Sequence, residues 1–254
     1  MKIRAAILSL ALCMAYQVTN AQFKQLAEGP KFEEPETGFV KIVQMKNGST
    51  VYFHLTPKDG INLRVYDATH AEKAAVTYNP TFERVKMPKR DGPFWPGENS
   101  ENIKGIFGIN NDLVVFISEE DRKKSILYRI IIDAATAKVK EEKAIFNSAG
   151  SFNVKKDPFS EHYAIYVTGI LEGETKRANR IYHYDNMHKE INHVLLESPE
   201  TGEDYNSVWY QDMVVIGADR VVVFYFASAI NTSKKEYPIW PLLLKALPQS
   251  LIKN

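Results

Sequence analysis

One pattern occurs three times in this chain, as Ile61-Asn62-Leu63-Arg64-Val65-Tyr66-Asp67, Ser125-Ile126-Leu127-Tyr128-Arg129-Ile130-Ile131-Ile132-Asp133 and Arg180-Ile181-Tyr182-His183-Tyr184-Asp185. Each version alternates apolar and polar residues over most of its length, as a half-buried strand does, and each ends in aspartate. A more apolar run precedes each version and a further strand-like run follows it. This repetition predicts an architecture built from similar small β-sheets.

Four segments align on this pattern, at residues 39–82, 102–147, 151–199 and 205–228. Their apolar second strands recur every 50 to 63 residues, at Phe53, Phe116, Tyr166 and Phe224. The first segment contains Asn47-Gly48, which is a strong hairpin signal. In the second segment we expect a charged loop at residues 119–124. Four short strands are expected in each of the first three segments and two in the fourth.

With this layout the chain resembles the β-propeller proteins that bacteria export. The resemblance covers about residues 39–226 and rests on the repeat layout, since neither a Trp-Asp dipeptide nor a Gly-Gly pair marks the repeats. It implies an all-β, propeller-like array of four-stranded antiparallel blades, with about three and a half blades visible in a ring of roughly four to eight. We favour an incomplete member of a larger ring over a small ring.

A two-sheet sandwich is the rival all-β architecture, because it also has short strands at regular spacing. The second strand of each repeat argues against it. These strands are apolar on both faces, as at Leu113-Val114-Val115-Phe116-Ile117. A strand covered on both sides has such a continuous apolar run, and stacked blades provide that environment.

Residues 1–21 have the features of a secretory signal peptide. Lys2 and Arg4 form a basic start, a short apolar run follows, and Thr19-Asn20-Ala21 offers a cleavage site. The apolar run is too short for a transmembrane helix. We therefore expect an exported protein, periplasmic or secreted, with no membrane span.

The one cysteine, Cys13, lies inside this segment, and Leu12 before it does not fit a lipoprotein signal. After cleavage the chain would have no thiol, hence no disulfide and no thiolate metal site. Cleavage also removes Lys2 and Arg4 and no acidic residue, so the net charge changes from +1 to −1. A nearly neutral protein has no electrostatic reason to bind nucleic acid.

The two ends of the repeat region differ from the repeats. Residues 22–38 are expected to lead into the first repeat, and residues 229–254 to form an atypical tail. The fourth repeat stops after Phe226, and a leucine-rich run at 239–245 follows. This run is expected either to cover one face of a blade or to mark a truncation.

The candidate ligand-binding residues lie on one loop and on the first strands. Phe94 and Trp95 stand between prolines in a stiff loop, and rigid aromatics on loops suit contacts with carbohydrate or protein. The alternative is that they fill the gap between two blades. The first strands of propeller blades line a central channel, where a basic ring would attract an anion. The candidates there are Lys41, Lys104, Lys155 and Trp209; the alternative for the lysines is ordinary solvation.

No motif of a common catalytic or metal site occurs. The sequence lacks a Gly-x-Ser-x-Gly elbow, a phosphate loop, a His-Glu-x-x-His motif and an Asp-x-Asp calcium loop. His183, His188 and His193 are evenly spaced, but pairing Tyr184 with Ile191 would place His183 and His193 on opposite faces of a sheet. We therefore predict no catalytic residue, no metal site and no cofactor.

The shared aspartates, Asp67, Asp133 and Asp185, invite comparison with a ring of carboxylates. Aspartate at a strand end more commonly accepts hydrogen bonds from the backbone of the following turn. We predict this turn role for all three.

The sequence favours a non-catalytic binding or scaffold domain of propeller type, acting outside the cytoplasm on an unidentified protein or carbohydrate. The alternative is an extracytoplasmic propeller enzyme, a hydrolase or lyase, with its site at the channel mouth or with the chain as part of a larger enzyme. Propellers host both functions.

Overall fold

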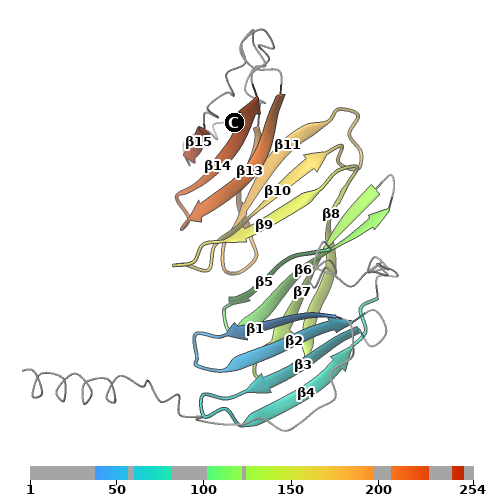
Figure 1. The fold of residues 1–254 in the computed structure, drawn as a ribbon, viewed down its shortest axis with the longest axis vertical. Coiled ribbons are helices and arrows are strands. Elements are labelled where there is room, and N and C mark those ends of the chain that lie inside the picture. Colours follow the sequence, from blue (N-terminus) through green and yellow to red (C-terminus); the bar gives the residue numbers. More distant parts are fainter. Residues whose placement is uncertain are drawn as a thin grey trace, which may run out of the picture. The chain divides into compact units, whose positions relative to one another are not determined.

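The structure is a computed structural model that describes residues 38–56, 60–81, 102–121, 124–196, 207–228 and 242–248. Every regular element in these ranges is a β-strand, and the strands form four antiparallel sheets in chain order (Figure 1). The fold is therefore all-β, as the repeated pattern predicts. The described ranges contain no helix that could span a membrane.

The first sheet contains β1 (Phe39–Gln44), β2 (Thr50–Thr56), β3 (Gly60–Tyr66) and β4 (Glu72–Tyr78). The second sheet contains β5 (Ile103–Ile109), β6 (Asp112–Asp121), β7 (Lys124–Asp133) and β8 (Val139–Ser148). The third sheet contains β9 (Phe152–Lys156), β10 (Tyr163–Gly169), β11 (Ala178–Tyr184) and β12 (Glu190–Leu196). The fourth sheet contains β13 (Ser207–Ile216), β14 (Arg220–Ser228) and β15 (Leu242–Pro248).

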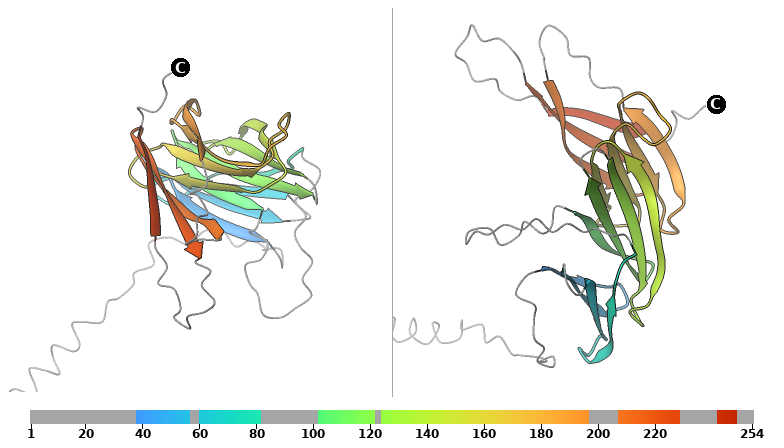
Figure 2. Two further views of the ribbon diagram at one scale, coloured as in Figure 1. Left: turned by 90° about the horizontal axis from the view of Figure 1, so that it is seen from above. Right: turned by 90° about the vertical axis from the view of Figure 1, so that its right-hand side faces the viewer.

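Each sheet is a meander, because every strand pairs with the next strand of the chain. Antiparallel neighbours need only short hairpins, and the sequence supplies them. At the β1–β2 turn the amide of Met45 donates to the Ser49 carbonyl at 2.8 Å, and Gly48 has a φ of 84°, which glycine adopts without strain. The sheets are twisted, as Figure 2 shows. Successive four-stranded meanders packed face to face make the fold propeller-like.

Apolar cores lie between consecutive sheets, and we name them the first, second and third seams in chain order. The strand β6 contributes to two of them. Leu113, Val115 and Ile117 lie in the first seam, between the first and second sheets. Val114 and Phe116 lie in the second seam, between the second and third sheets. All five side chains are 0% exposed, so both faces of this strand are core.

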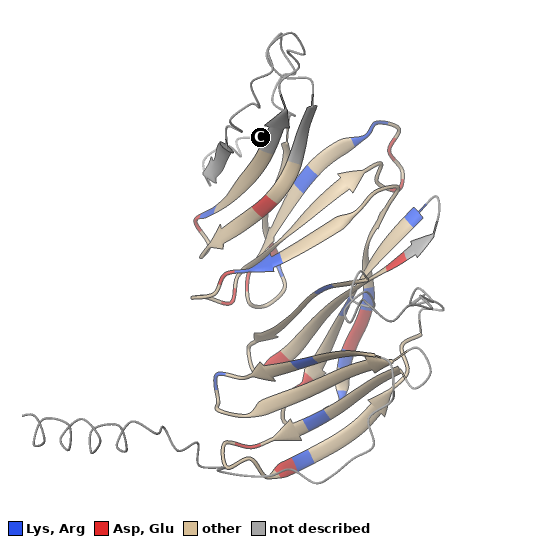
Figure 3. Cartoon of the chain, viewed as in Figure 1, with Lys and Arg blue, Asp and Glu red and all other residues tan. Residues whose placement is uncertain are grey.

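The strand β10 is divided in the same way. Tyr163, Ile165 and Val167 lie in the second seam, whereas Ala164 and Tyr166 lie in the third, between the third and fourth sheets. Neither β2 nor β10 carries a charged residue, as Figure 3 shows. The prediction that second strands are covered on both faces is confirmed for β6 and β10.

The predicted charged loop at residues 119–124 is wrong. The strand β6 continues to Asp121 and β7 begins at Lys124, with Glu119 paired to Ile126 across the ladder. Ladder hydrogen bonds are made by the backbone, so charged residues do not end a strand whose partner continues beside it. The hairpin connection is therefore shorter than the charge pattern indicates.

Most of the leucine-rich run forms an edge strand, so the first of the two expectations, that it covers a face of a blade, is wrong. Residues 242–248 form β15, which pairs antiparallel with β14 and adds a third strand to the fourth sheet. Edge pairing gives the backbone groups of β14 hydrogen-bond partners, which covering a sheet face would not. The fourth segment thus carries one strand more than its sequence pattern predicts.

We expect the variant Phe116→Ala to lower the free energy of unfolding by about 3–5 kcal/mol, because a fully buried ring leaves a cavity in the second seam. The ring contacts Phe107 and Tyr163, with centroid distances of 6.2 and 5.3 Å. Urea denaturation measures the change. Ile42→Ala is the control, since that side chain is 64% exposed. Equal losses in the two variants would contradict this assignment of the core.

Candidate functional site

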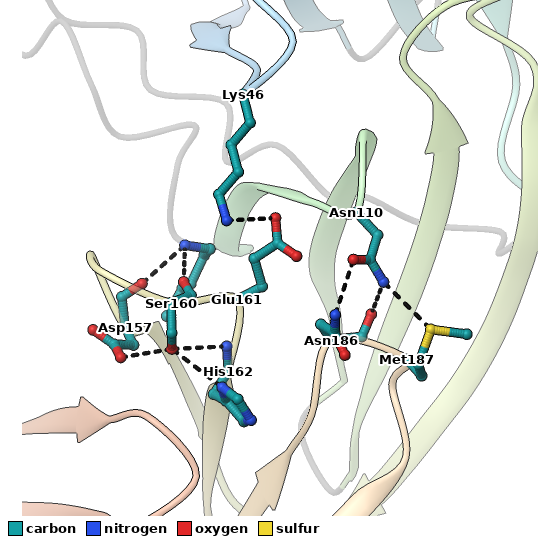
Figure 4. Close-up of polar contacts among 9 residues, drawn as sticks. Lys46, Asn110, Asp157, Ser160, Glu161, His162, Asn186 and Met187 are labelled. Atoms are coloured by element: carbon teal, nitrogen blue, oxygen red, sulfur yellow. Dashed lines mark hydrogen bonds and ion pairs between the residues drawn. The ribbon is translucent and has the colours of Figure 1, made fainter.

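Turns from all four sheets meet in a polar cluster. It includes Lys46 of the β1–β2 turn, the β5–β6 turn, the β9–β10 loop and the β11–β12 turn, and it reaches the β13–β14 turn through Gly217. We call it the hairpin-end cluster (Figure 4), and its members are Lys46, Asn110, Lys156, Asp157, Ser160, Glu161, His162, Asn186 and Met187. The contacts of Lys46 and Asn110 join residues far apart in the sequence, whereas those of Ser160 are local.

Glu161 is the carboxylate of this cluster that connects three other turns. Its Oε1 lies 3.0 Å from Lys46 Nζ, and its side chain is only 13% exposed. Burial alone would raise the pKa of Glu161, but hydrogen bonds from Lys46, the Asn110 backbone and the Asn186 side chain outweigh it and lower the pKa. Glu161 is therefore held as an anion by donors from three different turns.

Asn110 and Asn186 bind one another directly. The Asn110 side-chain amide donates to the Asn186 carbonyl at 2.6 Å, and the Asn186 amide donates to Asn110 Oδ1 at 3.0 Å. Asn110 has a φ of 50°, a conformation that asparagine tolerates better than most residues. The same residue type thus makes the tight β5–β6 turn and supplies the donors that reach the next sheet.

Asp157 fastens the β9–β10 loop. It is 4% exposed and accepts hydrogen bonds from the Phe159 amide at 2.9 Å and from the Gly217 amide at 2.8 Å. Burial acts to raise the pKa of Asp157, but these bonds and that from Ser160 lower it. Lys156 Nζ donates to the carbonyls of Asp157 and Ser160 at 2.8 and 2.5 Å. The loop is thereby fixed to itself and to the fourth sheet.

Asp157, Ser160 and His162 are the residue types of a nucleophilic triad, but they are hydrogen-bonded in a different order. Ser160 Oγ donates to Asp157 Oδ2 at 2.6 Å and lies 3.2 Å from His162 Nδ1. In a triad the imidazole stands between the carboxylate and the hydroxyl, so that it can take the proton of the nucleophile. Here the hydroxyl stands in the middle and its proton points to the carboxylate. The arrangement shapes a turn and does not activate a serine.

Two large apolar side chains project from these turns. Phe159 is 96% exposed and Met187 is 72% exposed. The amide of Met187 donates to Asp185 Oδ1 at 2.9 Å, and Asn110 Nδ2 lies 3.4 Å from Met187 Sδ. Both side chains therefore stand in solvent on backbones that their neighbours fix. The sequence search, which looked for known motifs, did not single out either residue.

The residues proposed from the sequence are distributed differently. Lys41 is exposed on β1, Lys104 is half-buried on β5, and Lys155 on β9 pairs with Asp212 at 2.9 Å. The first strands are neighbours, since β5 contacts β1 and β9, and β9 contacts β13. The pairing of Lys155 removes one charge from the predicted basic ring. Ligand binding by these lysines stays a prediction.

The other proposed binding residues cannot be compared with the structure. Phe94 and Trp95 lie outside the described residues. Trp209 pairs with Phe226 through the backbone of β13 and β14, and nothing of its side chain is described. A ligand-binding role for these three residues also stays a prediction.

The turn role of the shared aspartates is confirmed. Asp67 Oδ1 accepts from the amides of Thr69 and Ala71 at 2.8 and 3.0 Å. Asp133 Oδ1 accepts two amides at 2.9 Å each, and Asp185 Oδ1 accepts two amides at 2.9 Å each. Burial opposes ionisation of Asp133, but Lys140 and the turn amides lower its pKa to about 2. These carboxylates are structural parts of the turns.

Each of the three evenly spaced histidines has a different hydrogen-bond partner. His183 pairs with Asn192 as predicted, but Tyr184 pairs with Glu190 and not with Ile191, because the ladder is irregular there. His188 lies in the β11–β12 turn, with Nδ1 3.3 Å from the Tyr163 hydroxyl. His193 is bonded to Glu190 at 2.5 Å. Within the described ranges no group of three histidine, cysteine, aspartate or glutamate residues is placed to hold a metal ion.

Comparison with known proteins gives only distant structural likenesses. No family model matches the sequence, and no curated protein matches it. The structure is similar to a subtype N10 neuraminidase-like protein of A/little yellow-shouldered bat/Guatemala, with 8% identity, 83% of this chain covered and a TM-score of 0.33. The chain spans 60% of that protein's length.

A second likeness is to a GH43 endo-arabinanase from Bacillus licheniformis, with 10% identity and a TM-score of 0.22. It covers 82% of this chain and 92% of the arabinanase. Likenesses of this size carry no argument about what this chain binds or catalyses. The functional argument therefore rests on the chain's own residues.

We expect Asp157→Ala to lower the free energy of unfolding by about 1–3 kcal/mol, because the amides of Phe159 and Gly217 lose a buried acceptor. Asp219→Ala is the matched control, since Asp219 is an exposed aspartate in the β13–β14 turn. Guanidinium denaturation of both variants measures the difference. If the control loses as much stability as Asp157→Ala, the fastening role is wrong.

Two histidines make stability depend on pH near neutrality. Burial lowers the pKa of His183, and burial with the charge of Arg129 lowers the pKa of His188. The unfolded chain, with histidine pKa values of about 6.5, then binds more protons than the folded one. The free energy of unfolding is therefore highest above about pH 6.5, and it decreases as the pH falls below that value.

Urea denaturation at a series of pH values between about 8 and 5 checks this dependence. His183→Leu removes one of the two buried imidazoles, so the free energy of unfolding of this variant should depend less steeply on pH. A free energy of unfolding that stays constant or rises as the pH falls would show that neither buried histidine is held neutral.

Proposed function

We propose that this protein is a non-catalytic binding domain, acting outside the cytoplasm, that engages its partner through the hairpin-end cluster. The observation that carries this proposal is Phe159. Its side chain is 96% exposed, although its backbone is tied to a 4% exposed carboxylate, Asp157. A large aromatic that is fully in solvent on a fixed loop is available to fill a pocket on a partner.

The energetics favour binding at such a residue. Burying a phenylalanine side chain stabilises by about 1.5–3 kcal/mol. Because hydrogen bonds already fix the loop, binding costs little additional backbone entropy. Met187 adds an adaptable apolar side chain at the next hairpin of the third sheet. Loops on a rigid scaffold are where proteins of many folds place their binding residues.

The extracytoplasmic location is supported by residues 1–21, whose basic start, apolar run and Thr19-Asn20-Ala21 fit a signal peptide. One mechanism open to the rival hypothesis, an exported propeller enzyme, uses a nucleophile beside a proton acceptor. In the hairpin-end cluster the only such set has its serine proton held by Asp157. This arrangement favours binding over catalysis at this end of the hairpins.

Site-specific photo-crosslinking tests the proposal. A photoreactive phenylalanine analogue placed at position 159, in cells of the native host, should give a discrete adduct. The same analogue at position 195 is the matched control, since Leu195 on β12 is also an exposed apolar residue, at 56%. Phe159→Ala should weaken binding of the identified partner by roughly tenfold or more without changing stability. No adduct at 159, or equal adducts at both positions, would contradict the proposal.

The aromatic loop predicted from the sequence has its own test. Phe94→Ala with Trp95→Ala should abolish binding of that partner, or of a glycan on an array, and leave the thermal unfolding curve unchanged. If the double variant binds normally but unfolds at lower temperature, these aromatics fill a gap between blades. That outcome would leave the role of Phe159 untouched.

A further inference from the structure

The third seam differs from the other two in its polar atoms. Its faces hold four buried atoms with no hydrogen-bond partner, His183 Nε2, Asn192 Oδ1, Tyr210 Oη and Tyr225 Oη. A fifth such atom, Arg180 Nη1, lies on the opposite face of β11. All five residues lie on the third and fourth sheets. In the described ranges no such atom is found on the first or second sheet. Buried polar atoms are almost always satisfied, so this seam needs a further partner.

Two of these atoms face one small cavity. His183 and Asn192 are directly opposite on β11 and β12, and both line a cavity of about 20 Å³. Three apolar residues also line it, Ile181, Val194 and Val221, and so do three polar ones, His193, Asp219 and Arg220. The cavity therefore lies where the third sheet meets the fourth.

The protonation state of His183 follows from its other contact. His183 is 6% exposed and hydrogen-bonds the Gly217 backbone, whose amide is already donated to Asp157. Only the Gly217 carbonyl remains, and a carbonyl can only accept. Because Nε2 has no partner, Nδ1 must be the donor. In neutral His183 the Nε2 atom is then an acceptor, as is Asn192 Oδ1.

From this geometry we infer that the third seam contains a binding site for one water molecule, which donates one hydrogen bond to His183 Nε2 and one to Asn192 Oδ1. A water needs roughly 10–15 Å³ of such space and two to four polar partners. The cavity provides the space and the two acceptors require a donor.

The water has a structural role at this site. It completes the hydrogen bonding of β11 and β12 at the place where the β13–β14 turn covers them. Through Nδ1 and the Gly217 carbonyl, the same histidine ring is bonded to that turn. The hydrated site therefore connects the third and fourth sheets by polar contacts, beside the apolar contacts of the seam.

Two measurements on the wild-type protein test the inference. Long-range proton–nitrogen NMR should show His183 protonated at Nδ1 only, with a cross-relaxation signal between its ring proton and a long-lived water. A high-resolution crystal structure should show a density peak within about 3.2 Å of both Nε2 and Oδ1. An Asn192 amide that is flipped, so that Nδ2 donates directly to Nε2, would overturn the inference, since no water is then needed.

A double-mutant cycle gives an independent test. His183→Leu and Asn192→Leu each leave one acceptor with a poorly held water, and each should lower the folding equilibrium constant on the order of tenfold. The double variant removes both acceptors, so its loss should be smaller than the product of the single losses. The control Lys189→Leu, at an exposed position in the β11–β12 turn, should change little. Multiplicative losses in the cycle would contradict a shared water.

A metal ion is the competing occupant, because imidazole nitrogen and amide oxygen can both ligate one. Adding an excess of zinc chloride should leave the melting temperature of the wild-type protein unchanged. A rise in the melting temperature of the wild type that is absent in His183→Leu would show that the site takes a cation, and the inference of a water site would be wrong.

Discussion

The sharing of each central strand between two cores is the constraint on which the rest of the structure depends. Along β6, Leu113 packs toward the first sheet and Val114 toward the third. Along β10, Ile165 and Tyr166 are divided in the same way. Side chains alternate along a strand, so neither seam can form fully without positioning the other. A β-sheet covered on both faces is therefore the unit of this fold, and its hairpins end at defined places.

The hairpin-end cluster is a consequence of that placement. The strands bring turns far apart in the sequence within reach, and short polar side chains then connect them, as Asp157 does with Gly217. In these contacts the carboxylate of Asp157, the hydroxyl of Ser160 and the imidazole of His162 bind one another. Two large apolar side chains on these turns, Phe159 and Met187, stay exposed. Under the proposed binding role, a partner would meet a surface that is already ordered.

The strand order and the covered second strands could be predicted from the sequence, because both are local patterns. The turn aspartates were predictable for the same reason, since each binds amides two to four residues ahead. The hairpin-end cluster was not, because Lys46 and Glu161 are brought together only by the packing of sheets. The strand β15 was missed because its register with β14 is set by a partner strand and not by its own pattern. The irregularity beside Tyr184 depends on pairing geometry that no spacing shows.

The chain-order meander has a consequence for how the protein folds. Each sheet uses consecutive residues, and each seam joins sheets that are neighbours in the sequence. Strand pairings in such a molecule are short in sequence separation, which speeds folding relative to β proteins with distant pairings. The first sheet can form while later segments are still being synthesised. Each new sheet can then pack against the sheet that precedes it in the chain. The exception is β15, because residues 229–241 separate it from its partner β14. The last of the described strands is therefore also the last to pair.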